Sequence, residues 1–104
     1  MEEKALCIII TKNSNPLKGV LSFYNFYLKG EISKLIYQNK INLNSKEKII
    51  LYKNETCKMF PEKIIFFLNF FENAEEKIRE TLESLKITES FIIKQEESNG
   101  KKAI

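Results

Sequence analysis

The stretch that decides the fold lies at residues 63–70, which read KIIFFLNF, and residues 71–76 continue as FENAEE. Six of the first eight side chains are apolar, and no polar residue interrupts residues 64–68. A short apolar run of this kind is typical of a central strand that is buried in a sheet. Asn73, with Glu76 three residues later, has the spacing of a helix N-terminus. The sequence therefore predicts a buried strand that leads directly into a helix.

The C-terminal part of the chain continues this pattern. Apolar residues recur at helical spacing after Asn73, which predicts an amphipathic helix. Its apolar stripe consists of Ala74, Ile78, Leu82 and Leu85. Residues 91–95 (FIIKQ) then predict a final strand. Residues 96–104 are polar and show no periodicity, so we expect a flexible polar tail after a single domain at residues 1–95.

The N-terminal part predicts a strand followed by a helix. Residues 4–11 contain the apolar run ALCIII, and the polar residues 12–15 follow it. Asn15 and Pro16 form a typical helix start, because asparagine caps a helix and proline fits its first turn. The apolar stripe of this helix is Leu17, Leu21, Tyr24 and Leu28. Gly30 then provides a helix stop.

The segment between this helix and the strand at residues 63–70 allows two interpretations. In the first, residues 31–38 form the second strand, and residues 48–54 (KIILYKN) extend the hairpin that follows it. In the second, residues 47–54 are the second strand, and the first helix runs on towards Lys40. Both interpretations give the order strand, helix, strand, strand, helix, strand.

Three segments resemble the RNA recognition motif (RRM) family, in the order in which that family has them. They are residues 6–11, residues 26–32 (FYLKGEI) and residues 63–82, the last of which begins with a match to the family's second sequence motif. The resemblance implies an α+β, ferredoxin-like βαββαβ sandwich, with two helices on one face of a four-stranded antiparallel sheet. It also implies that the other face of the sheet binds single-stranded RNA. Ile64 departs from the family, which has a glycine at that position.

A second resemblance competes for the first helix. Residues 18–25 (KGVLSFYN) are similar to the Gly-x-Leu-x-x-aromatic-Asp/Asn signature of Sm-like proteins, in which this segment is a strand. Pro16 and the helical spacing of the apolar residues favour a helix instead. Further along, Lys29 and Glu31 stand where the Sm-like pattern has Asn and Gly.

The RRM resemblance implies a functional sheet face, and the local charge balance adds a Lys-rich hairpin beside it. The residues assigned to the open face are Cys7, Ile9, Ile65 and Phe67. Only the last of them offers an aromatic ring on which a base can stack. The residues assigned to the hairpin are Tyr52, Lys46, Lys48, Lys53 and Lys58. Between residues 29 and 63, eight Lys stand against four Glu, a net charge of +4.

Two hypotheses for the function follow. The first is a non-enzymatic, RRM-like module that binds single-stranded RNA weakly through the sheet face, while the Lys-rich hairpin follows the phosphate backbone. The alternative is a protein–protein interaction or dimerisation domain that uses the apolar sheet face, because aliphatic patches more often mark a protein contact. For the lysines themselves, a solvated loop is the plain alternative.

The composition excludes several kinds of catalytic and metal site. The chain has no His, no Asp and no Trp, and its basic residues are all Lys except Arg79. Without His or Asp, neither a Ser–His–Asp triad nor a His-based metal site can be built from this chain. The chain also lacks a glycine-rich phosphate loop and paired CxxC cysteines. We therefore expect no enzymatic activity, no cofactor and no metal.

Cysteine use and hydropathy indicate the compartment. Cys7 lies in an apolar run and is expected to be buried, whereas Cys57 lies in a polar loop, and we expect no disulfide between them. No apolar run reaches the length of about 18 residues that a membrane span needs, and the N-terminus lacks a signal-peptide pattern. An intracellular protein without a membrane partner is the expectation.

Overall fold

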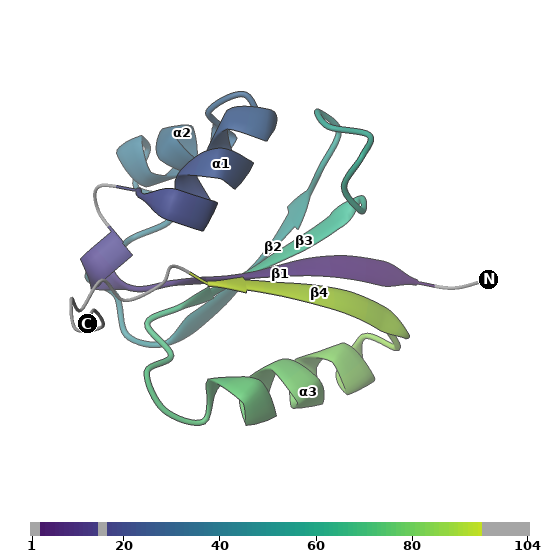
Figure 1. Cartoon of the computed structure of the whole chain (residues 1–104). Helices are drawn as coiled ribbons and strands as arrows, with labels where there is room; N and C mark the ends of the chain where they lie inside the picture. Colours follow the sequence, from purple (N-terminus) through teal and green to yellow (C-terminus); the bar gives the residue numbers. More distant parts are fainter. Residues whose placement is uncertain (1–2, 15–16, 95–104) are drawn as a thin grey trace, which may run out of the picture.

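The predicted central strand lies inside a sheet that has helices on both sides (Figure 1). The computed structural model of the chain describes residues 3–14 and 17–94. In chain order the elements are β1 (Lys4–Ile10), a 3-10 turn η1 (Lys12–Ser14), α1 (Gly19–Tyr27), α2 (Glu31–Tyr37), β2 (Lys48–Lys53), β3 (Lys63–Leu68), α3 (Ala74–Ser84) and β4 (Glu89–Lys94).

The described strands form a mixed four-stranded sheet in the order β2-β3-β1-β4. β1 runs parallel to both β3 and β4, so that Ile8 pairs with Phe66 on one side and with Ile93 on the other. β2 runs antiparallel to β3. The α+β class is therefore confirmed, whereas the expectation of an antiparallel sheet is wrong.

The direction of β2 follows from a break in the first helical segment. A single helix after β1 would return the chain to the end of the sheet where β1 begins, and β2 would then run parallel to β1. Instead, Lys29 and Gly30 have positive φ values of 58° and 77°, and the chain turns into a second helix. The chain then enters β2 at Lys48, which pairs with Leu68 at the end where β1 and β3 finish. β2 is antiparallel to both strands for this reason.

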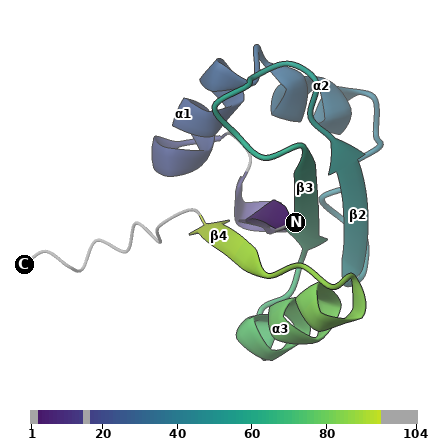
Figure 2. The same ribbon diagram turned by 90° about the vertical axis from the view of Figure 1, so that its right-hand side faces the viewer.

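Helices cover both faces of the sheet. α1 and α2 lie on one face, and α3 lies on the other (Figures 1 and 2). The chain moves from β1 to β3 in one direction along the sheet, and from β3 past β1 to β4 in the other. Right-handed crossovers in opposite directions place their connecting helices on opposite faces. The expected sandwich with one open sheet face is therefore wrong.

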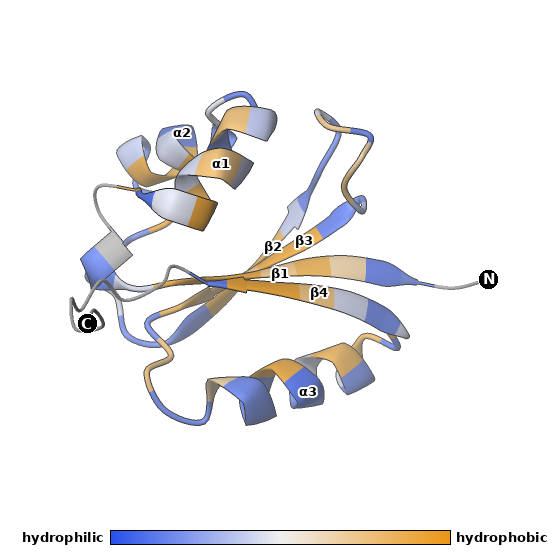
Figure 3. Ribbon diagram, in the orientation of Figure 1, coloured by the Kyte–Doolittle hydropathy of each residue, from blue (hydrophilic) through white to orange (hydrophobic). Residues whose placement is uncertain are grey.

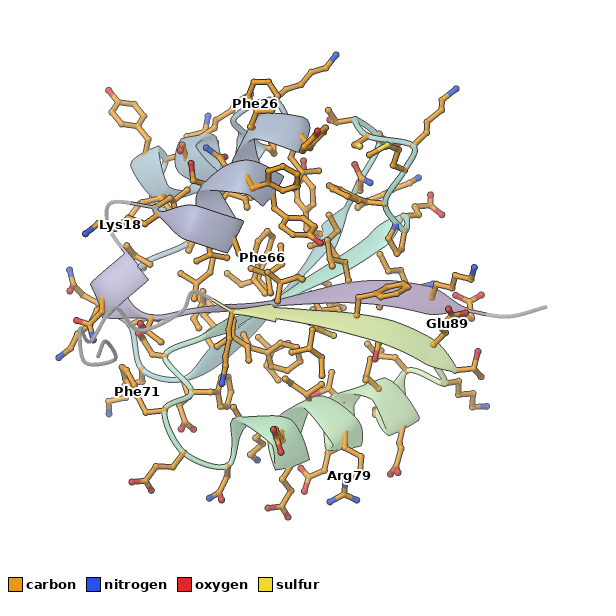
Figure 4. The ribbon with its side chains drawn as sticks, in the orientation of Figure 1. Lys18, Phe26, Phe66, Phe71, Arg79 and Glu89 are labelled. Carbon is orange, nitrogen blue, oxygen red and sulfur yellow. The ribbon has the colours of Figure 1, made fainter. Side chains whose placement is uncertain are left out.

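Each face of the sheet has its own hydrophobic core. On the α1/α2 face, Ile8 and Phe66 are buried in one cluster with Leu21 of α1, and Figure 4 shows Phe66 on this side. On the α3 face, Ile65 and Phe67 are buried in a second cluster with Ile78 of α3. Successive side chains of a strand point to opposite faces, so a strand with two cores must be apolar throughout. This explains the unbroken apolar run of β3.

The segment that allowed two interpretations is now assigned. Residues 31–37 are helix α2, so the interpretation with a strand at residues 31–38 is wrong. The second strand is β2, at residues 48–53, as the second interpretation placed it at residues 47–54. The single helix running on towards Lys40, which belonged to the same interpretation, is wrong, because the chain breaks at Lys29 and Gly30 into two helices. The strand that the Sm-like resemblance implies for residues 18–25 is not formed, because most of that segment is α1.

The start of α3 differs from the predicted capping pattern. Asn73 does precede the helix, but it adopts a left-handed conformation with φ of 60°, and its side chain makes no capping hydrogen bond. Its carbonyl accepts a hydrogen bond from the Lys77 N–H at 3.0 Å. The predicted helix start at Asn15 and Pro16 and the predicted tail at residues 96–104 lie outside the described residues.

Candidate interaction surface

The sheet face predicted to bind RNA or a partner is covered by α3. Cys7, Ile65 and Phe67 are fully buried, and Ile9 is half-buried against the same cluster. Burial raises the pKa of the Cys7 thiol to about 11, because the charged thiolate is disfavoured away from water. These four residues are therefore core residues, and their assignment to an open binding face is wrong.

The predicted hairpin residues do not gather at one place. Lys46 and Lys48 lie at the start of β2, while Lys53 and Lys58 lie at or beyond its other end. A six-residue strand separates its ends by about 17 Å, because each residue advances the chain by about 3.3 Å. Lys53 is paired with carboxylates of the same end of the molecule, Glu55 at 3.5 Å and Glu62 at 3.6 Å.

Tyr52 belongs to the edge of the core and not to an exposed stacking surface. Its ring lies 6.0 Å from that of Phe66 in an edge-to-face arrangement. Burial, followed by the nearby carboxylate of Glu31, raises the pKa of Tyr52 to about 12. The structure thus leaves the lysines as the exposed members of the predicted set, divided between two places.

Three exposed aromatic residues lie together on α1, a segment to which the sequence assigned no site. Phe26 is 74% exposed and Phe23 is 55% exposed, while Tyr27 and Val20 are each 37% exposed. We call these four residues the aromatic surface. Figure 4 shows Phe26 on the side of α1 that points away from the sheet.

The rings of the aromatic surface contact one another. The centroids of Phe23 and Tyr27 are 4.7 Å apart, and those of Phe26 and Tyr27 are 5.5 Å apart, both edge-to-face. Tyr27 also contacts Phe60, which in turn lies 5.0 Å from Tyr24. The surface therefore contacts the core through Tyr24 and Phe60.

An open hollow adjoins this surface. It has a volume of about 680 Å³ and is lined by Ser22, Asn25, Phe26, Tyr27, Lys29 and Gly30. The Asn25 side chain fixes the angle between the two helices, because its Oδ1 accepts from the Ser33 N–H at 3.0 Å and its Nδ2 donates to the Ser33 hydroxyl at 2.8 Å. The lining contains one cation and no carboxylate.

The two helical layers carry opposite charge. Between residues 17 and 40, four Lys stand against one Glu, a net charge of +3. Between residues 72 and 86, five Glu stand against two Lys and one Arg, a net charge of −2. Figure 3 shows the outer side of α3 as hydrophilic, whereas hydrophobic colour continues over α1. The α1/α2 layer is therefore both the basic and the apolar outer surface.

A sequence signal for this surface did exist. Leu21, Tyr24 and Leu28 define the stripe that faces the sheet, and Phe23 and Phe26 lie off that stripe. An amphipathic helix normally presents polar residues there. Aromatic residues on the outer side of a helix are therefore the feature to look for.

Metal-binding groups of side chains are absent from the described residues. No group of three or more His, Cys, Asp or Glu side chains in that part of the chain stands close enough to hold a metal ion. Cys7 and Cys57 are both unpaired thiols. Among the described helices, none has the length and apolar character needed to cross a membrane.

Comparison of the chain with protein-family models, with curated proteins and with solved structures finds no match in any of the three.

Proposed function

We propose that this chain is a non-enzymatic protein-interaction domain and that the aromatic surface of α1 is its contact surface. The observation that carries this proposal is the exposure of Phe23 and Phe26 in a chain that buries Phe66 and Phe67 completely. Fully burying a phenylalanine side chain is worth about 1.5 to 3 kcal/mol, so a partner that covers two half-exposed rings gains a comparable free energy. Contiguous exposed apolar patches mark contact sites for the same reason.

The spacing of the surface fits a helix that docks against a partner. Phe23, Phe26 and Tyr27 stand at i, i+3 and i+4, which is the anchor pattern of helix-in-groove recognition. α1 has nine residues and is therefore about 13 Å long. A helix of that length covers only part of the roughly 800 Å² that each partner buries in a standard interface. The contact is expected to be transient, with an acidic rim opposite Lys18 and Lys29 at the two ends of the helix.

Single-stranded RNA is a second candidate for the same layer, and one observation favours it. The α1/α2 layer combines its net charge of +3 with exposed rings at Phe23, Phe26 and Tyr37, the last of which is 90% exposed. Stacking of a base on an aromatic side chain contributes about 1 to 3 kcal/mol. RNA would then bind to helices and not to the sheet face that the RRM resemblance implies.

One substitution separates these two candidates. Phe26→Lys places a charge on the most exposed ring of the aromatic surface. A protein contact should lose its affinity, because the ammonium group must be desolvated. Binding of RNA should fall less, because attraction to phosphate offsets part of the lost stacking. The matched control is Phe71→Lys, at a phenylalanine that is 59% exposed on a different part of the molecule.

The measurement combines affinity capture with a direct RNA titration. Proteins captured from a lysate of the source cells by the wild-type chain are quantified by mass spectrometry beside those captured by the two variants. We expect a set of proteins that Phe71→Lys retains and Phe26→Lys loses. Fluorescence anisotropy with mixed single-stranded RNA tests the second candidate. Identical capture by all three chains, together with salt-dependent RNA binding, would replace the first candidate by the second.

A further inference from the structure

β2 is an edge strand whose outer backbone is available to a further strand. Within the described residues, β2 pairs with β3 alone. Just beyond β2, the Asn54 N–H donates to the Glu62 carbonyl at 2.7 Å, which makes these two residues a hydrogen-bonded pair of the ladder. Because such pairs alternate in an antiparallel ladder, the backbone groups of Ile49 and Leu51 point away from β3. No hydrogen bond joins these outward groups to another described residue.

A groove lies between this edge and α2. It has a volume of about 350 Å³, and its apolar lining includes Leu35, Ile41 and Ile50. Figure 2 shows α2 above β2 at this side of the sheet. Side chains of a strand alternate between its two faces, so every second side chain of a strand added beside β2 would point toward the groove. Backbone pairing then supplies affinity and the groove supplies selectivity.

The opposite face of the same edge is apolar and exposed. Leu51 is 62% exposed and Ile49 is 37% exposed. The buried cluster under α3 includes no residue of β2, so α3 does not cover these side chains. Edge strands are usually protected by charges, bulges or a covering segment. Here the described edge has charges only at its ends, Lys48 and Lys53, and presents IILY between them.

The charges beside this edge are mainly positive. Lys34 and Lys40 line the groove and Lys48 begins the strand, and none of the three belongs to an ion pair within the described residues. Glu31 is the one carboxylate in the lining, and it lies beside the hydroxyl of Tyr52. Carboxylates of a segment bound at this edge would therefore lie near lysines that make no ion pair within the described residues.

We propose that the outer edge of β2 binds an extended peptide segment that is apolar in its middle and acidic at its ends. The segment adds as a fifth strand, with alternate side chains in the α2 groove and over Ile49 and Leu51. A second copy of this chain fits less well, because it would bring a second set of the lysines Lys34, Lys40 and Lys48 to the same edge. Like charges that lie close together repel each other. This surface is separate from α1, and the proposal does not depend on the function proposed for the aromatic surface.

The first test uses charge. The probe is a labelled peptide with glutamate at both ends and alternating valine and threonine between them, titrated into the full chain by fluorescence anisotropy. We expect binding that weakens by about tenfold or more in the double variant Lys34→Glu with Lys40→Glu, since about 1.4 kcal/mol corresponds to a factor of ten. The matched control Lys58→Glu reverses an exposed lysine outside the groove and should bind as the wild type does. A peptide with lysine at both ends should bind more weakly.

The second test uses the backbone. Leu51→Pro removes an outward N–H and leaves the bonds to β3 in place, as proline does in natural edge strands. It should abolish peptide binding, while Leu51→Thr, which keeps the N–H, should retain most of it. Cooperative thermal unfolding of both variants shows that each has folded. In the peptide, N-methylation of one alternate set of amides should abolish binding, and methylation of the other set should not.

Three results would overturn the proposal. The first is no binding of the acidic peptide up to about 1 mM, the weakest affinity expected of a specific contact. The second is equal binding by both N-methylated peptides. The third is a wild-type dimer that Leu51→Pro dissociates, because the occupant is then a second copy. Phe26→Lys should bind the peptide normally, so failure here is distinguishable from failure of the α1 contact.

Discussion

Residues 19–27 and residues 63–71 each contain four aromatic residues, but the two stretches differ in how far the fold exposes their rings to solvent. Phe66 and Phe67 in β3 are inaccessible to solvent, whereas Phe23 and Phe26 in α1 are largely exposed. β3 has a strand on each edge and a helical layer on each face. α1 has the sheet on one side and solvent on the other. The number of covered sides, and not the aromatic content, separates a core segment from a contact segment.

This difference is the basis on which we propose the aromatic surface of α1 as the contact layer. A strand enclosed on four sides can contribute to stability but cannot meet a partner. The rings of the aromatic surface lie outside the buried clusters, and Tyr27 among them contacts Phe60. If the comparison is right, substitutions in β3 should change the free energy of unfolding, and substitutions in α1 should change binding.

The largest effect is expected for Phe67→Ala. Its ring is buried under α3, so its removal leaves a cavity and should lower the free energy of unfolding by about 3 to 5 kcal/mol. Phe66→Ala should cost about as much on the other face, because that ring is equally buried. Urea denaturation followed by circular dichroism measures both. Phe71→Ala is the control, and equal stability of Phe67→Ala and Phe71→Ala would mean that α3 does not cover this face.

Asn69 should give the next largest effect, because it joins three loops at the end of β3. Its Oδ1 accepts from the Lys12 N–H at 2.9 Å, and its Nδ2 donates to the carbonyls of Leu43 at 3.0 Å and Ser45 at 2.7 Å. Asn69 also has a φ of 58°, which asparagine tolerates better than alanine. Asn69→Ala should therefore cost about 2 to 4 kcal/mol, since each buried unpaired group costs about 1 to 3 kcal/mol.

The control for this substitution is Asn44→Ala. Asn44 is exposed, and within the described part of the chain its one hydrogen bond is from its backbone N–H to the Asn42 side chain. We expect a change of less than about 0.5 kcal/mol, as for most surface substitutions. Equal urea midpoints for the Asn69 and Asn44 variants would show that the three loops are not held together by this side chain.

The elements were largely predictable from the sequence. The strand at residues 63–68, the helix that follows it and the final strand lie within a few residues of the predicted positions. Residues 31–37 also carried a helical signal, because Ile32, Leu35 and Ile36 stand at helical spacing and not in alternation. The resemblance to a family with a strand at this position favoured the other interpretation.

Strand direction and the covered face were not predictable in the same way. An apolar run shows that a strand is buried, but it does not encode the direction in which the strand runs. The direction of β2 depends on the turn at Lys29 and Gly30, which looked like a simple helix stop. The open face came from the family resemblance, whereas the residues of β3, apolar on both faces, already indicated a strand covered on both sides. The site was consequently sought on the sheet and not on α1.

The two cysteines test the covered face without any substitution. Cys7 is buried under α3 and Cys57 is half-buried in the loop before β3. Near pH 8, iodoacetamide should therefore modify Cys57 in the folded chain and modify Cys7 only after urea is added, which mass spectrometry of the fragments can follow. Equal modification rates for the two thiols would mean that the face is open.

The same thiol makes stability depend on alkaline pH. Burial raises the pKa of Cys7 from 9.0 to about 11, so the unfolded chain releases this proton first. The contribution of the Cys7 thiol to the free energy of unfolding is complete below pH 9.0 and is lost as the pH rises to about 11. Tyr52, with its pKa raised from 10.0 to about 12, adds a similar loss at higher pH. In Cys7→Ala, the free energy of unfolding should fall less steeply between pH 9.0 and about pH 11 than it does in the wild type.

The smallest effect on stability is expected for Phe26→Ala, and it is the counterpart of Phe67→Ala. The ring of Phe26 is 74% exposed, and its aromatic contact is the one with Tyr27 at 5.5 Å. An edge-to-face pair contributes about 0.5 to 1.5 kcal/mol beyond its buried area, and solvent on most sides puts this pair at the lower end. Alanine also has the higher helix propensity, which offsets part of the loss.

We expect a net change of less than about 0.5 kcal/mol in urea denaturation. A loss above about 2 kcal/mol would be a core-sized effect and would mean that the ring is buried in the free chain, so the aromatic surface would belong to the core and could not serve as a contact.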